Sequence, residues 1–190
     1  MSLMRTFVAL DISPESQSRA SQLVDRLRTS GAQVSWTAPE NLHLTLKFLG
    51  DVPDTRIPEV CRAVAKAAVD FAPFTVHFRG AGAFPNAERP RTIWMGVDMG
   101  ADTTILLQKA IENALYKLGF PPEQRRFVPH LTLGRVRSGG PTQLALAACL
   151  VKAAEFDGGS SIIDEVVTYA SILERTGPTY SVLGRADLQG

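Results

Sequence analysis

The sequence predicts an α+β fold, in which two facing lobes combine helices with largely antiparallel sheets. Segments that alternate in hydrophobicity like strands are mixed with segments of helical spacing, without the regular strand–helix alternation of a fully parallel sheet. The tetrapeptide His-Leu-Thr-Leu also occurs twice, at residues 43–46 and 130–133, which indicates two units of similar build. The chain has 190 residues, 45% of them hydrophobic, and is long enough to form one compact domain over residues 1–190.

The first half of the chain reads as strands and helices in mixed order. Residues 5–12 form an apolar, β-rich run, and Ser13-Pro14 after it is a typical helix start. The helix that follows has apolar residues at helical spacing and ends at Gly31. We then expect strands at 33–36 and 41–50, a helix at 54–71, and strands at 74–84 and 91–99.

The second half begins after a helix at 101–119 that ends at Gly119 and separates the two copies of the tetrapeptide. We expect a strand at 125–136, a helix at 141–156, and strands at 161–174 and 179–188. The segment Arg-Thr-Gly-Pro between the last two strands is a turn signal, so these strands are expected to pair.

Charge and composition limit the possible partners and location. Twenty basic and nineteen acidic residues leave a net charge of +1, so any site for a polyanion must be local. No apolar run approaches the roughly 20 residues that span a bilayer, and no signal segment is evident, so we expect a cytoplasmic protein. The segment before Met4 is a possible non-native addition. Cys61 and Cys149 lie in alanine-rich helical segments and are expected as buried thiols without a disulfide.

The repeated tetrapeptide places two polar side chains on one face of each strand. Successive side chains of a strand point to opposite faces, so His43 and Thr45 share a face, and His130 and Thr132 do the same. The leucines between them point into the core. By the same alternation Lys47 is expected on the histidine face.

Two imidazoles across a groove are suited to cleaving a phosphodiester. Because the pKa of histidine is near 6.5, one ring can accept a proton from water while the other gives a proton to the departing oxygen. The Thr45 and Thr132 hydroxyls and a nearby cation would stabilise the phosphoryl oxygens. A zinc site is the rival chemistry, but zinc usually needs three or four ligands, and neither copy contains an acidic residue or a cysteine. We interpret the third histidine, His77, as structural.

Over nearly its whole length the chain resembles the two-histidine (2H) phosphoesterases, specifically the LigT-like RNA 2′,3′-cyclic phosphodiesterases. The segments that carry the resemblance are "RTFVALDI", "NLHLTLKFLG", "PRTIWMGV", "FVPHLTLGR" and "YASILERTGPTYSVL". The resemblance implies a bilobal α+β fold in which two antiparallel sheets, related by an approximate twofold axis, form a central groove with helices on the outside.

The resemblance also implies a reaction and its residues. RNA ends with a 2′,3′-cyclic phosphate would be opened by water to 2′-phosphates, without a metal or other cofactor, and the reverse joining would form a 2′-5′ linkage. His43 and His130 match the catalytic histidines, and Thr45 and Thr132 match the phosphate-binding threonines. We assign His43 as the acid that protonates O3′ and His130 as the base that activates water, with the reverse assignment left open.

Two further positions match substrate-binding residues of these relatives. Phe48 would stack on a base, and Arg135 would bind phosphate. Each lies five positions after its histidine, and since five is odd, a regular strand would turn both away from the groove. Gly50 and Gly134 could permit a bulge that re-aims them, while the alternative for Phe48 is a core aromatic.

Other residues and functions remain open. Arg89, Arg91, Arg125, Arg126 and Arg137 could follow an RNA backbone or form a solvated face, and Trp36 and Trp94 are expected as core anchors. The alternative functions are action on another cyclic phosphate or a 2′-5′ oligonucleotide, and a non-catalytic RNA-binding module. We expect a monomer with no obligate protein partner and no membrane association.

Overall fold

The computed structural model describes residues 2–137, 140–174 and 177–190. The strands of this part are β1 (Leu3–Asp11), β2 (Val34–Trp36), β3 (His43–Pro53), β4 (Phe74–Phe84), β5 (Thr92–Val97), β6 (His130–Val136), β7 (Asp157–Ile163), β8 (Glu165–Glu174) and β9 (Gly177–Asp187). The helices are α1 (Pro14–Arg28), α2 (Ile57–Ala68), α3 (Ala101–Tyr116) and α4 (Thr142–Lys152), with short 3₁₀ turns η1 (Pro39–Asn41) and η2 (Asp54–Arg56).

The described strands form one antiparallel sheet. Its order is β7-β4-β5-β6-β3-β1-β8-β9. Strand β2 pairs with the end of β6 that does not pair with β3. The α+β class with antiparallel pairing is therefore confirmed, but the expected division into two separate sheets is not. The two sets of strands are joined at the centre, where β3 pairs with β6 through the single Cα pair of Leu44 and Leu131.

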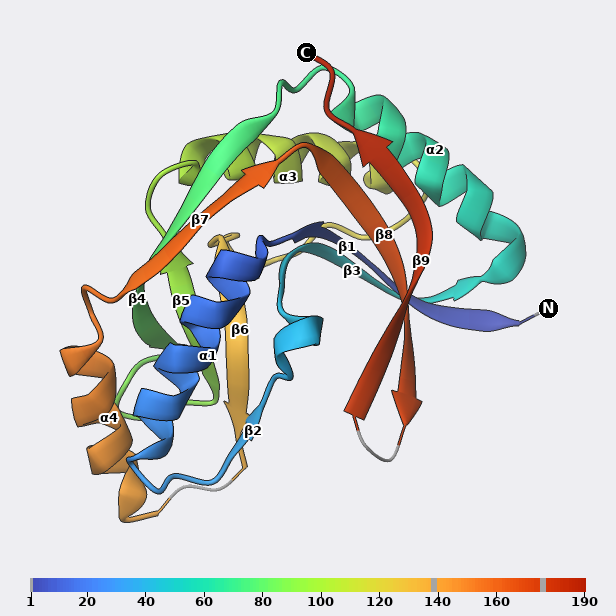
Figure 1. Ribbon diagram of the computed structural model, residues 1–190. Coiled ribbons are helices and arrows are strands. Elements are labelled where there is room, and N and C mark those ends of the chain that lie inside the picture. Colours follow the sequence, from blue (N-terminus) through green and yellow to red (C-terminus); the bar gives the residue numbers. More distant parts are fainter. Residues whose placement is uncertain (1, 138–139, 175–176) are drawn as a thin grey trace.

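The helices lie in two pairs around this curled sheet (Figure 1). One pair is α2 with α3, and α2 also packs against β8 and β9. The other pair is α1 with α4, where α1 packs against β7 and α4 packs against β4. Buried side chains from both pairs and from the sheet form one hydrophobic core cluster.

Local sequence explains where the first helix begins and which face it buries. Ser13 is the N-cap, and its hydroxyl oxygen accepts a hydrogen bond from the backbone N–H of Ser16 at 3.1 Å. Pro14 occupies the first turn, where its missing N–H costs nothing. Leu23 and Leu27, one turn apart, are fully buried. This helix thereby packs its apolar stripe onto the sheet and leaves its charged residues in solvent.

The prediction of a single strand at 161–174 is wrong, because this segment belongs to two strands, β7 and β8, which are separated at Asp164. The part before Asp164 pairs with β4 at one end of the sheet, and the part after it pairs with β1 and β9 at the other. Strand β7 also begins earlier than predicted, at Asp157. Gly158 permits this start, because a Cβ there would lie 2.6 Å from the Met95 sulfur.

Candidate active site

The two copies of the tetrapeptide lie side by side at the centre of the sheet. The antiparallel pairing of Leu44 with Leu131 sets a register in which His43 stands opposite Thr132 and Thr45 stands opposite His130. Both leucines are fully buried, whereas the four polar side chains are half-buried on the opposite face. The structure thus brings together the four residues that the sequence analysis selected.

A β-bulge in each strand explains how the fifth residue after each histidine reaches the same face. In β3, Val8 pairs with Lys47 and Ala9 with Thr45, so Leu46 is an extra residue between them. After Leu46 the side chains alternate again, but each points to the opposite face from the one that a regular strand would give it. Phe48 consequently lies on the histidine face with 64% of its surface exposed, which excludes its placement in the core.

The bulge in β6 occurs at the equivalent position. Ile93 pairs with Gly134 and Trp94 with Thr132, so Leu133 is the extra residue and Arg135 turns to the histidine face. Gly134 is needed beside the bulge, because a Cβ there would lie 2.7 Å from a methyl group of Val34 on β2. Gly134, which the sequence analysis named as a position that could permit a bulge, therefore makes room for it. The extra residue of the bulge is Leu133, one position earlier.

The same bulge corrects the prediction for Lys47. This side chain was expected beside His43, but it lies on the core face, and the residue as a whole is only 6% exposed. Its ammonium group forms an ion pair with Glu112 of α3 at 2.7 Å and donates a hydrogen bond to the Pro121 carbonyl at 2.9 Å. A buried charge is tolerated here because it is paired and hydrogen-bonded.

The two imidazoles are oriented in the same way. His43 Nδ1 lies 2.8 Å from the Asn41 carbonyl oxygen, and His130 Nδ1 lies 2.6 Å from the Val128 carbonyl oxygen. A carbonyl can only accept, so each Nδ1 carries a proton and each Nε2 is the nitrogen available to a substrate. Burial lowers the pKa of both rings below the usual value, more than these carbonyl bonds raise it.

Five of the six predicted site residues line a cleft of about 530 Å³. They are His43, Thr45, Phe48, Thr132 and Arg135, which come from β3 and β6. The rest of the lining comes from β2, η1, the two residues between them and the start of β9. His130 is not among the lining residues of this cleft, and its place beside the site follows from its register with Thr45.

Sequence reasoning missed the aromatic wall around His43. Phe7 of β1 stacks on the His43 ring at 4.8 Å, and Tyr180 of β9 meets that ring edge-on at 5.3 Å. Burial raises the pKa of Tyr180, and the nearby Arg135 charge acts against this. Asn41 ties the hairpin to the cleft by donating a hydrogen bond to the Pro178 carbonyl at 2.8 Å. Phe7 comes from the first strand and Tyr180 from the last, and no motif in the sequence connects them with His43.

Other predicted residues lie elsewhere. All five remaining arginines that were considered, Arg89, Arg91, Arg125, Arg126 and Arg137, are exposed and do not line the cleft. Trp36 packs partly on the core but also lines the cleft. Trp94 is opposite Thr132 in β5 and packs against Phe84 at 5.3 Å, so it is not a core anchor. Cys61 and Cys149 are unpaired thiols in α2 and α4.

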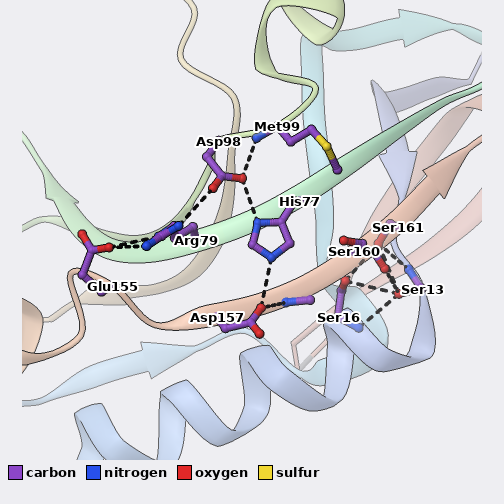
Figure 2. A network of polar contacts seen from close by, with 11 residues as sticks. Ser13, Ser16, His77, Arg79, Asp98, Met99, Glu155, Asp157, Ser160 and Ser161 are labelled. Carbon is purple, nitrogen blue, oxygen red and sulfur yellow. Dashed lines mark hydrogen bonds and ion pairs between the residues drawn. The ribbon is translucent and has the colours of Figure 1, made fainter.

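His77 belongs to a polar network away from the cleft (Figure 2). Its Nδ1 lies 2.8 Å from an oxygen of Asp98, and its Nε2 lies 3.1 Å from an oxygen of Asp157. Arg79 extends the network to Glu155. These contacts connect β4 to β7 and to the turn before α3, which agrees with a structural role.

Neither a metal-binding cluster nor a membrane-spanning helix is found among the residues that the structure describes. Within 2–137, 140–174 and 177–190, no group of three or more His, Cys, Asp or Glu side chains is placed to hold a metal ion. None of the helices in these segments is both long and apolar enough to cross a membrane.

A curled antiparallel sheet in which two His-x-Thr strands lie side by side is the arrangement that the sequence analysis expected of a phosphoesterase. The sequence pattern of the LigT-like phosphoesterases matches residues 10–94 and again residues 96–180. The chain therefore belongs to the LigT-like phosphoesterase family, and the predicted family and enzyme class are confirmed.

Individual relatives cover almost the whole chain. A protein of Methanothermobacter thermautotrophicus named RNA 2′,3′-cyclic phosphodiesterase is 36% identical over 94% of this chain and 95% of its own length. One of Thermotoga maritima with the same name is 34% identical over 98% of this chain and 97% of its own.

Solved structures show the same fold. The TT0787 protein of Thermus thermophilus has a TM-score of 0.82 and 26% identity over 98% of this chain and 99% of its own. Escherichia coli LigT complexed with 3′-AMP has a TM-score of 0.79 and 25% identity, with both chains fully covered.

Proposed function

We propose that this protein hydrolyses the 2′,3′-cyclic phosphate at RNA ends to a 2′-phosphate by acid–base catalysis with two histidines and without a metal ion. The observation that carries the proposal is the pairing of β3 with β6, which sets His43 opposite Thr132 and His130 opposite Thr45 on one face. The relatives named RNA 2′,3′-cyclic phosphodiesterase and the LigT complex with 3′-AMP support this choice of substrate.

In the proposed reaction a water oxygen attacks phosphorus as the bond from phosphorus to O3′ breaks. His130 Nε2 accepts the proton of the water, and protonated His43 Nε2 donates a proton to O3′. The phosphate remains on O2′, so atoms and charge balance in one displacement. Each positioned proton transfer contributes roughly 10² to 10⁴ in rate.

The other cleft residues have roles that follow from their chemistry. The Thr45 and Thr132 hydroxyls donate hydrogen bonds to the phosphoryl oxygens, on which charge develops. The Arg135 guanidinium pairs with the phosphate, for which its planar fork is well suited. The exposed Phe48 ring offers a surface on which the terminal base stacks regardless of its identity.

The same displacement also supports joining of RNA ends. If the 5′-hydroxyl of a second strand replaces water, the attack expels O3′ and leaves a 2′-5′ linkage. In dilute solution water outnumbers this hydroxyl, so we expect hydrolysis to dominate. The alternative substrates, another cyclic phosphate or a 2′-5′ oligonucleotide, are distinguished by a substrate panel with phosphorus NMR of the products.

The test uses a nucleoside 2′,3′-cyclic phosphate in the presence of EDTA. We expect His43→Ala and His130→Ala each to lose at least 100-fold in kcat. His77→Ala is the matched control, because His77 lies outside the cleft, and it should retain the wild-type rate. Full activity in either His43→Ala or His130→Ala would disprove the proposed mechanism. Salt-sensitive RNA binding by a wild-type protein without turnover would instead indicate a binding module.

A further inference from the structure

The strand beside β3 places an acidic residue next to one of the two histidines. Asp11, the last residue of β1, is the Cα partner of His43. The two side chains line a common pocket of about 350 Å³ that adjoins the cleft. Tyr169 of β8 holds the carboxylate in place, because its hydroxyl donates a hydrogen bond to Asp11 Oδ1 at 2.6 Å.

The corresponding position beside His130 carries no side chain. The Cα partner of His130 on β5 is Gly96. A Cβ there would lie 2.9 Å from the Arg79 carbonyl oxygen and 3.2 Å from the Trp94 ring, so a side chain fits only if the backbone shifts. The difference between the two histidines is therefore part of the packing of the sheet.

In the local strand features that orient the two rings the histidines are matched. Each is bound through Nδ1 to the carbonyl two residues earlier, each has a threonine two residues later, and each precedes a bulge by three residues. The neighbouring strands, however, place the carboxylate of Asp11 opposite His43 and a glycine opposite His130, and a negative charge beside an imidazole favours its protonated form.

We propose that Asp11 is a positioning residue that keeps the proton on His43, and so makes His43 the proton donor and His130 the base. This inference rests on the proposed function and assigns roles within it. Asp11 faces His43 across the strand pair and does not bind the phosphate, since a carboxylate would repel that anion.

Other charged and titratable groups also lie around His43, but Asp11 is the one whose charge raises the pKa of His43. The other groups are Glu40 of η1, Tyr169 of β8, Tyr180 of β9 and Arg135 of β6. Burial raises the pKa of both tyrosines, so they stay neutral. For His43, burial lowers the pKa most strongly, while the Asn41 carbonyl and then the Asp11 charge act in the opposite direction.

The first test measures the imidazoles directly and requires no turnover. NMR titration of the ring nitrogens in wild type and Asp11→Asn should show a lower pKa for His43 in the variant, with His130 and His77 unchanged. Asp51→Asn is the matched control, because Asp51 is an exposed residue at the other end of the same strand pair. An unchanged His43 titration in Asp11→Asn would overturn the proposal.

If Asp11→Asn does not fold, the wild-type protein still provides a test. When the pH is lowered through the range in which carboxyl groups become protonated, the ring signals of His43 should show a second inflection, and those of His130 should not. The same inflection at both rings, or at neither, would refute the role of Asp11.

The second test is the pH dependence of kcat/KM for a nucleoside 2′,3′-cyclic phosphate. A proton donor must be protonated, so removal of the Asp11 charge should move the alkaline limb to lower pH and leave the acid limb in place. At pH values above the limb, each unit of displacement lowers the rate about tenfold. Movement of the acid limb alone would show that the roles are reversed. A wild type with no activity would contradict the proposed function, while the NMR titration would still decide the inference.

Discussion

Leu46 and Leu133 occupy equivalent positions in β3 and β6, because each is the extra residue of a bulge three positions after a histidine. Each bulge turns the residue two positions later, Phe48 or Arg135, onto the histidine face. A regular strand would have placed both of these side chains on the core side. The width of the candidate active site thus depends on two local irregularities at the same place in two strands.

Replacing Phe48 by Ala should weaken substrate binding. Stacking of a base on an aromatic ring contributes about 1 to 3 kcal/mol, so we expect KM to rise about 5- to 150-fold with little change in kcat. Phe48→Tyr should restore the wild-type KM, because it preserves the ring. Leu144→Ala, at an exposed position on α4, serves as the control in the same steady-state assay. An unchanged KM in Phe48→Ala would show that no base stacks there.

Replacing Arg135 by Ala should reduce kcat/KM by about 10- to 150-fold. A hydrogen bond to a charged partner contributes about 1.5 to 3 kcal/mol, and the phosphate would lose this partner. Arg125→Ala removes the same charge from an exposed position outside the cleft and should have almost no effect at moderate ionic strength. Equal losses of kcat/KM in the two variants would mean that Arg135 contributes only to the overall electrostatic potential of the protein and does not bind the phosphate.

The ion pair between Lys47 and Glu112 leads to a prediction about stability. The Lys47 side chain is 4% exposed, so Glu112→Gln would leave its charge buried without a charged partner. We expect a loss of about 3 kcal/mol or more in the free energy of unfolding, measured by urea denaturation. The double variant Lys47→Met/Glu112→Gln should recover most of this loss, because no uncompensated charge remains. A double variant no more stable than Glu112→Gln would argue against this explanation.

His77 should make stability depend on pH above neutrality. Its hydrogen bond to Asp98, together with that to Asp157, raises the pKa of His77 against a smaller effect of burial. A group whose pKa is raised on folding stabilises the protein fully below the unfolded pKa, about 6.5, and the contribution is lost as pH rises through the folded value. The difference in melting temperature between wild type and His77→Gln should therefore be larger at pH 6 than at pH 9. A difference independent of pH would exclude a charged His77.

The sequence by itself determined the local features of this protein. The order of the helices and most strands, the core leucines and the outward direction of the His-x-Thr side chains follow from periodicity and from end signals such as Ser13-Pro14. These features depend on residues within a few positions of one another. The family resemblance added the residues five positions after each histidine, but periodicity placed Phe48, Lys47 and Arg135 on the wrong faces.

Only the tertiary structure decided how distant segments meet. The bulges at Leu46 and Leu133 exist because β1 and β5 pair with one residue fewer than β3 and β6 supply, and the break at Asp164 exists because the two parts of one apolar run pair with opposite ends of the sheet. The same holds for the asymmetry between the histidines, since Asp11 and Gly96 come from neighbouring strands that no pattern within β3 or β6 specifies. Strand alternation is a property of one segment, whereas register is a property of two, and the placement of these side chains depends on register.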